Sequence, residues 1–389
     1  MRRSTLIALA ACAALAAAFA AVLLVTRDSD SAVVPVAGAN PHPVAGNFVP
    51  NDVTLAQCGD DGACYEQAFG NLAFGEGPKR ALARFEQLMA EQQAVESNCH
   101  RIAHTIGSAA LARFEGNVAK TFAEGAATCW SGYYHGVLER AFVGASSFEE
   151  LGRRSRGICD DAGIRSTTWL AYQCVHGLGH GLMIQTGYAL PTSLRICDRL
   201  ATDWDRTSCH GGVFMENISS SYGIRSKWIK DDDPVYPCPA VQEKYKLYCY
   251  LMVTSRVLET NGYDFAAAAK TCAGVERNWV ATCFQSLGRD ASGNSRQDPE
   301  RILEICLAAG AGRSDCIYGA ARDMTADAAG GEEAAVLCRR SPRAERALCF
   351  NAIGRIVSSF GPEEATRNAC ASVAGKYVRD CLSGAGLAA

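Results

Sequence analysis

The feature that most constrains the fold is a regular series of paired cysteines. The chain has 389 residues and 19 cysteines, and all but Cys12 lie downstream of an apolar N-terminal segment. From Cys238 onward, the first cysteine of each pair recurs every 32 to 34 residues, and its partner follows 10 or 11 residues later. A fixed period of this length is typical of a repeat architecture.

Each repeat has the pattern of a helix hairpin. The segments 298–306, 330–338 and 361–370 begin with a turn or capping residue and continue as a helical stretch that ends at the first cysteine. Breaker or polar residues follow, and the second cysteine lies on a second helix. On one continuous helix, cysteines 11 residues apart would be about 16 Å from each other, too far for a disulfide. The sequence therefore predicts an all-α, disulfide-stapled α-solenoid.

The spacing predicts five disulfides in the C-terminal part, and no CxxC motif points to a metal ribbon instead. These five pairs are Cys238–Cys249, Cys272–Cys283, Cys306–Cys316, Cys338–Cys349 and Cys370–Cys381. Four looser pairs continue the series upstream, where spacing alone leaves the connectivity open: Cys58–Cys64, Cys99–Cys129, Cys159–Cys174 and Cys197–Cys209. Disulfides persist outside the cytoplasm, so most of the chain is expected in a periplasmic or extracellular space.

Residues 1–27 are expected to lie outside the folded part. Arg2 and Arg3 precede an uninterrupted apolar run from Leu6 to Val25. This length suits a transmembrane anchor that contacts the membrane and leaves the remainder extracytoplasmic. Cleavage as a signal peptide, which would give a secreted protein, is the alternative. Residues 28–54 are rich in Pro, Gly and Ala and are predicted to be a linker.

Three further regions follow the linker. Residues 55–218 form a histidine-rich helical half, whose first helical stretch is expected at 78–96. Residues 219–237 are a long loop or lid, and residues 238–389 are the paired-cysteine hairpins. The formal net charge of −3 gives no sign of a nucleic-acid-binding surface, so no nucleic-acid partner is expected.

Histidine separates the two halves. Six of the seven histidines lie between residues 100 and 210, each close to a cysteine, and the hairpins from Cys238 onward contain none. If histidine were a packing requirement of the hairpin, it would recur wherever the paired cysteines do. Its restriction to one half therefore indicates a functional site.

The histidine positions predict a metal site. Three clusters place metal-ligand side chains four residues apart, on one helical face: His100/His104, His135/Glu139 and His176/His180. The fourth contains His210 and Glu216, six apart. These eight residues predict a centre for a divalent transition metal, with zinc, copper or iron as candidates and one or two ions.

Glycines interleave the histidines in the segment 174–183. Gly177, Gly179 and Gly181 alternate with His176 and His180, although each interior glycine costs a helix about 0.8–1 kcal/mol relative to alanine. We expect these glycines to let backbones crowd around the metal centre.

One hairpin position changes from histidine to arginine between the halves. The residues that follow the second cysteine by six are His135, His180, Arg289, Arg322 and Arg355. Equivalent positions of a solenoid line the same face, often the concave one, so these side chains are expected to face a shared groove. For the arginines, local ion pairs with the neighbouring aspartates are an equally good interpretation.

Two classes of function fit these features. The first is an extracytoplasmic metalloenzyme that uses metal-activated water or copper or iron redox chemistry. The second is a non-catalytic scaffold whose groove binds a peptide, a glycan or a partner protein. HExxH, GxSxG, phosphate-binding glycine loops and CxxCH are absent from the sequence, so it does not decide whether the chain is an enzyme.

Overall fold

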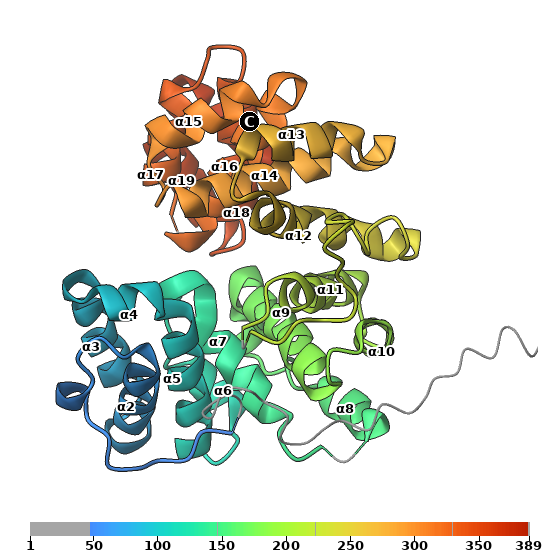
Figure 1. Ribbon diagram of the computed structural model, residues 1–389. Coiled ribbons are helices and arrows are strands. Elements are labelled where there is room, and N and C mark those ends of the chain that lie inside the picture. Colours follow the sequence, from blue (N-terminus) through green and yellow to red (C-terminus); the bar gives the residue numbers. More distant parts are fainter. Residues whose placement is uncertain (1–46, 146, 222, 329, 388–389) are drawn as a thin grey trace, which may run out of the picture. The chain divides into compact units, whose positions relative to one another are not determined.

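The computed structural model describes residues 47–145, 147–221, 223–328 and 330–387, and in this part every regular element is a helix (Figure 1). The predicted anchor or signal segment, residues 1–27, lies outside the described residues. Among the helices that are described, none is long and apolar enough to cross a membrane.

The helices are short, and most are arranged in hairpins. The α-helices are α2 (Gly62–Glu76), α3 (Pro78–Glu91), α4 (Gln93–Ser97), α5 (Cys99–Arg113), α6 (Val118–Phe122), α7 (Thr128–Ala141), α8 (Phe148–Ser155), α9 (Thr168–Gln185), α10 (Leu190–Cys197), α11 (Asp203–Ile218), α12 (Glu243–Asn261), α13 (Phe265–Gly274), α14 (Val280–Asn294), α15 (Pro299–Ala308), α16 (Arg313–Asp327), α17 (Glu332–Arg340), α18 (Arg346–Val357), α19 (Glu363–Ala374) and α20 (Val378–Gly384). The 3-10 turns are η1 (Leu55–Gln57), η2 (Ile164–Ser166), η3 (Arg277–Trp279), η4 (Gly310–Gly312) and η5 (Gly375–Tyr377).

Nine disulfides staple the described part of the chain. The five predicted C-terminal pairs are confirmed, and the four looser upstream pairs also form. Their Cα–Cα distances run from 5.2 to 5.9 Å. Such a density of disulfides indicates an oxidising, extracytoplasmic environment.

The hairpin of α15 and α16 shows how the sequence builds one repeat. The Asp298 carboxylate accepts the Glu300 backbone N–H at 2.9 Å, and Pro299 occupies the first turn, where a missing N–H costs nothing. The turn η4 then reverses the chain and brings Cys306 to Cys316, both fully buried. The disulfide is therefore part of the core between the two helices.

Successive helices pack into one continuous row, which we call the inner row. Its members, each in contact with the next, are α2, α5, α7, α9, α11, α12, α14, α16, α18 and α20. In the C-terminal hairpins, the helices α13, α15, α17 and α19 carry the first cysteines and pack against this row. The predicted helical repeat is therefore present, and all the candidate site residues of the sequence lie on the inner row.

Glycines allow the inner helices to approach closely in both halves. A Cβ at Gly212 would lie 1.9 Å from the carbonyl oxygen of His176, and one at Gly354 would lie 1.8 Å from that of Cys381. Only a residue without a side chain fits at such distances. Since the second contact is in the half that has no histidine, the close glycine packing is a property of the helix pairs. The expected crowding of backbones around the histidines is therefore present, but it also occurs away from them.

The predicted stretch 78–96 is helical at both of its ends, but it is divided into two helices and is not the first helix of the described part. A helix already begins at Gly62, where the Asp61 side chain accepts the backbone N–H groups of Ala63 and Cys64. The predicted helix over 78–96 is interrupted at Gln92, whose extended backbone separates α3 from α4. Because α2 packs on both α3 and α5, it is not apolar on a single face, which hid it in the sequence. Between α11 and α12, by contrast, the described residues form the expected loop.

Candidate metal centre

Five of the six histidines of the N-terminal half gather on three neighbouring inner helices. Figure 1 shows these helices, α5, α7 and α9, side by side. We call the set the histidine cluster: His100, His104, His135, His176 and His180. All except His100, which is partly exposed, are at most 2 % exposed. The i,i+4 spacing thus does place two side chains on one face of α5 and two on one face of α9.

The two i,i+4 pairs face each other across His135. Within each pair, the Nε2 atoms approach closely, at 3.0 Å between His100 and His104 and 3.3 Å between His176 and His180. The His135 ring stacks on His180 with a centroid distance of 4.4 Å and meets His104 edge-on at 5.4 Å. Inward-facing nitrogens of five imidazoles therefore converge in a buried space.

Two fully buried carboxylates contact the outer ring nitrogens, Nδ1, of two histidines of this cluster. Glu139 lies 2.8 Å from Nδ1 of His104, and Glu216 lies 2.9 Å from Nδ1 of His180. A carboxylate acceptor places the proton of the imidazole on Nδ1 and leaves the Nε2 lone pair directed inward. The two glutamates thus define which nitrogen of each ring faces the cluster.

A backbone carbonyl does the same for His100. The Cys129 carbonyl lies 2.9 Å from Nδ1 of His100. This contact lies at an unusual start of α7, where Cys129, Trp130 and Ser131 have φ values of 51°, 52° and 62°. Non-glycine residues rarely adopt such angles, and conformations of this kind cluster at functional sites.

Burial keeps most of the cluster neutral. Burial, together with the charge of His104, lowers the pKa of His100 and His180 to about 3, and burial also holds the pKa of His135 and His176 well below the ordinary value. Although burial acts against its charge as well, the adjacent Glu139 raises the pKa of His104. Neutral imidazole is the form that binds a metal, so four of the five rings are already in the ligand state.

Glu216 is the most extensively bonded group of the site. Besides His180, it accepts the Tyr188 hydroxyl at 2.6 Å, the Ser221 hydroxyl at 2.6 Å and the Ser221 backbone N–H at 3.0 Å. Burial raises the pKa of Glu216, and these donors oppose that effect. The beginning of the loop after α11 is therefore anchored directly to the site.

A third buried carboxylate, which the sequence did not suggest, lies nearby on α2. Glu66 is 1 % exposed, pairs with Arg101 at 3.0 Å and acts electrostatically on His104. Three buried carboxylates thus surround the cluster, and the cations close to them are Arg101 and, when protonated, His104. Carboxylates buried in this way need compensating positive charge.

His210 is the one predicted site residue that the structure places elsewhere. It lies on α11, 3.1 Å from a carboxylate oxygen of Asp198, and its ring meets that of Tyr245 edge-on at 4.8 Å. Lys244 binds the other oxygen of the same carboxylate at 2.6 Å. This network joins α11 and α12 and contains a single histidine.

The other seven predicted residues form three overlapping groups, in each of which the possible ligand atoms lie within 4.8 Å of one another. The groups are His100–His104–His135, His135–His176–His180 and Glu139–His180–Glu216. Because His135 and His180 are each shared between two groups, the possible ligand atoms could serve one ion or two adjacent ions.

Several residues that contact the cluster were not predicted from the sequence. Tyr188 and Ser221 have no sequence relationship to the histidine pairs, since they reach Glu216 through tertiary structure. Tyr172 had a usable signal, because it precedes His176 by four residues and therefore lies on the same face of α9. Its ring stacks on that of His176 at 5.0 Å.

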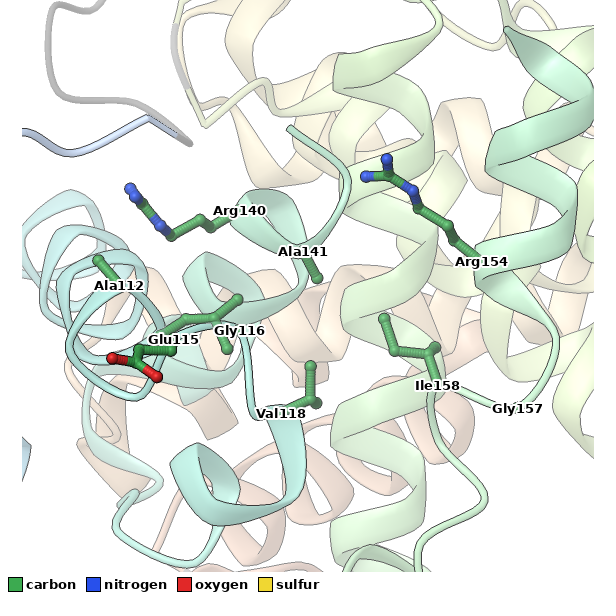
Figure 2. Close-up of a pocket in the computed structure, with 10 residues that line it drawn as sticks. Ala112, Glu115, Gly116, Val118, Arg140, Ala141, Arg154, Gly157 and Ile158 are labelled. Carbon is green, nitrogen blue, oxygen red and sulfur yellow. The ribbon is translucent and has the colours of Figure 1, made fainter. Parts of the chain in front are cut away.

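A surface cavity of about 470 Å³ lies elsewhere, where the C-terminal ends of α5 and α7 meet α8. Figure 2 shows Arg140 and Arg154 on opposite sides of it. Both guanidinium groups bind backbone carbonyls, of Phe48 and Val143 respectively. The lining includes no member of the histidine cluster, so this cavity is separate from the candidate metal centre.

The geometry of the cluster thus rests on local helical spacing, buried acceptors and close glycine packing. These features describe what the site can bind, and they do not by themselves name a family. Comparisons with protein-family models, with curated proteins and with solved structures found no match to the chain.

Proposed function

We propose that this protein is an extracytoplasmic helical-repeat protein that binds a divalent transition metal through the imidazoles of the histidine cluster. Zinc, copper and iron are the candidates, because imidazole suits each of them. The observation that carries the proposal is the paired Nε2 atoms, turned toward each other while an acceptor lies beside Nδ1 of His100, His104 and His180.

The separations of the paired nitrogens fit two ligands of one ion. Metal–nitrogen distances of 2.0–2.1 Å in a tetrahedral site separate neighbouring ligand nitrogens by about 3.3–3.4 Å. The His176–His180 pair is at 3.3 Å and the His100–His104 pair is slightly closer, at 3.0 Å. A cation between two inward lone pairs also removes their mutual repulsion.

The charge of the surroundings supports the same conclusion. Glu66, Glu139 and Glu216 are buried around rings that are mostly neutral. A bound divalent ion would add further positive charge beside these carboxylates. In this proposal Glu139 and Glu216 are not ligands. They orient His104 and His180 by accepting hydrogen bonds from Nδ1 of each ring, whereas the sequence pattern predicted both glutamates as ligands.

An enzymatic role fits better than a structural one. Nine disulfides already staple the fold, so a metal is not needed to hold the helices together. His100 is partly exposed and is the member of the cluster that solvent can reach. We therefore propose metal-dependent chemistry, by activated water or by redox at copper or iron, with the N-terminal segment tethering the protein to a membrane.

The test is elemental analysis of protein purified without a histidine tag, with two matched variants. His100→Ala removes a partly exposed ligand and should lower the metal affinity by at least tenfold. His210→Ala removes a histidine of the same half that lies outside the cluster, and it should leave the metal content unchanged. Absence of stoichiometric metal from the wild-type protein, even after incubation with zinc, copper or iron, would contradict the proposal and favour a binding scaffold.

A further inference from the structure

An exposed tryptophan lies beside the member of the histidine cluster that solvent reaches. His100 is partly exposed, whereas the other four histidines are at most 2 % exposed. The Trp130 ring meets the His100 ring edge-on, with 6.3 Å between the centroids and an interplanar angle of 64°. Trp130 is nevertheless 50 % exposed. The indole therefore borders the accessible side of the cluster.

The backbone that holds Trp130 in this place is strained. Cys129, Trp130 and Ser131 all have left-handed φ values, of 51°, 52° and 62°. Residues with a side chain adopt this conformation at a cost, which persists only where the surrounding structure enforces it. Glycine adopts it freely, yet the chain places an indole there. The conformation of this segment thus has a reason other than its own stability.

Contacts on both sides of the indole fix this segment. A disulfide joins Cys129 to Cys99 at the start of α5, directly before His100. The Thr128 hydroxyl donates to Glu86 on α3 at 2.7 Å. The Cys129 carbonyl lies 2.9 Å from Nδ1 of His100. The same strained turn therefore holds the carbonyl against one side of His100 and presents the indole beside it.

Other tryptophans of the chain have packing roles that Trp130 does not share. Trp279 stacks on Tyr250 at 5.7 Å, and Trp169 meets Tyr134 edge-on at 5.6 Å. Both of these tryptophans are partly buried against the hydrophobic core. Trp130 is exposed, and its ring contact is with a candidate metal ligand instead.

We propose that Trp130 binds an aromatic ring of the substrate, whose metal-binding oxygen group reaches the ion beside His100. Indole stacks on other aromatic rings in offset or edge-to-face geometry. A sugar ring is the alternative, but its hydroxyl groups need hydrogen-bond partners, and the polar side chains next to the indole, Thr128 and Glu86, already bind each other. The part of the inference that involves the ion rests on the proposed metal function, whereas the ring contact at Trp130 does not require a metal.

The test compares the binding of benzohydroxamate and acetohydroxamate, two zinc-binding probes that differ in carrying a phenyl or a methyl group. In calorimetry on the zinc-loaded protein, we expect benzohydroxamate to bind about tenfold more tightly, because its phenyl ring is buried and stacks on the indole. Trp130→Gly should fold, since glycine accepts a φ of 52°, and should lose most of this preference. Trp130→Phe should retain most of it.

Trp204→Ala is the matched control. Trp204 is a second exposed tryptophan of the same half, at 40 %, but its ring meets that of Tyr172 and not that of His100. This variant should keep the wild-type preference for the phenyl probe. Equal affinity of the wild type for the two probes would overturn the inference, as would an equal loss of preference in Trp204→Ala and Trp130→Gly.

Measurements without metal separate this inference from the metal function. In saturation-transfer NMR, the phenyl protons of benzohydroxamate should receive saturation from the wild type and much less from Trp130→Gly, whether or not the sample holds zinc. A wild type that never takes up zinc but shows this difference would contradict only the metal function. A wild type that binds zinc but transfers saturation as Trp130→Gly does would contradict only the role of Trp130.

Discussion

The two halves of the inner row share a backbone design and differ in the side chains they enclose. In the N-terminal half a Cβ at Gly136 would lie 1.9 Å from the His104 carbonyl oxygen, and in the C-terminal half a Cβ at Gly288 would lie 1.9 Å from that of Cys316. Disulfides staple hairpins in both halves. Yet one half encloses imidazoles with buried glutamates, and the other encloses hydroxyl groups, aspartates and arginines.

The network of the C-terminal half shows that the scaffold needs no histidine. The Thr254 hydroxyl lies 2.5 Å from that of Ser286 and donates to Asp290 at 2.7 Å, and Arg289 binds the same carboxylate. These groups satisfy one another without an ion. The histidine cluster instead turns the Nε2 atoms of neighbouring, mostly neutral imidazoles toward each other, and that difference is the reason to propose a metal ligand for it.

The largest loss of stability is expected at the closely packed glycines, which both halves share. Gly212→Ala and Gly354→Ala should each destabilise the protein by about 3 kcal/mol, because the added methyl group meets backbone that cannot move aside without separating two inner helices. Urea unfolding followed by circular dichroism measures this.

Glycines with open space around them in the last turn of a helix provide the control. At Gly75 in α2 and Gly293 in α14 an added Cβ meets no atom within 4 Å, so alanine should stabilise each helix by about 0.5–1 kcal/mol. Destabilisation by Gly212→Ala but not by Gly354→Ala would show that the halves do not share this packing, and that close glycine contacts matter only near the histidine cluster.

Removal of metal should lower the local stability of the N-terminal half and leave that of the C-terminal half unchanged. An ion present at about 100 times its dissociation constant stabilises the folded state by about 2.7 kcal/mol, and this stabilisation should appear where the ion binds. Hydrogen–deuterium exchange before and after chelation should show faster exchange in α5, α7 and α9 and unchanged exchange in α14, α16 and α18. Equal changes in both sets of helices would argue against a local site.

The role of the buried glutamates predicts a smaller effect on metal binding. Glu216→Gln keeps an acceptor for Tyr188 and Ser221 but weakens the hold on Nδ1 of His180, so metal affinity should fall by about 10- to 100-fold. Asp290→Asn, in the corresponding network of the other half, should leave metal affinity unchanged. Competition with a chromogenic chelator measures both. Loss of metal by Asp290→Asn would contradict the separation of the two networks.

The predictable part of this molecule is the part governed by local spacing. The period of the cysteines predicted the hairpins correctly, because a disulfide requires a short distance between two residues that are close in sequence, as at Cys306 and Cys316. The i,i+4 rule placed His176 beside His180 for a similar reason. Both inferences need only the geometry of one helix or one turn.

The unpredicted part depends on contacts between helices. Helical spacing cannot tell which ring nitrogen faces inward, so it did not distinguish Glu216 as an acceptor for Nδ1 of His180 from Glu216 as a ligand. Nor could it show that His210 would bind Asp198 or that Glu66 would be buried near the cluster. Such features follow from how the inner helices pack, which the sequence pattern does not encode locally.

The smallest predicted effect concerns the pH dependence of the C-terminal half. Burial raises the pKa of Asp323 from 3.8 to about 7, so the folded protein binds this proton more tightly than the unfolded chain does. The resulting stabilisation is complete below about pH 4 and is lost as the pH rises toward 7. Because the side chain is partly exposed, we expect the change to be about 1 kcal/mol.

Asp323→Asn should remove this decline, whereas Asp232→Asn, at an exposed loop position, should reproduce the wild-type profile in urea unfolding between pH 4 and 8. If the profiles of wild type and Asp323→Asn run parallel, Asp323 is ionised throughout. It would then be a full counter-charge to the arginines of the C-terminal half, and the comparison of that half with the histidine cluster would have to include this negative charge.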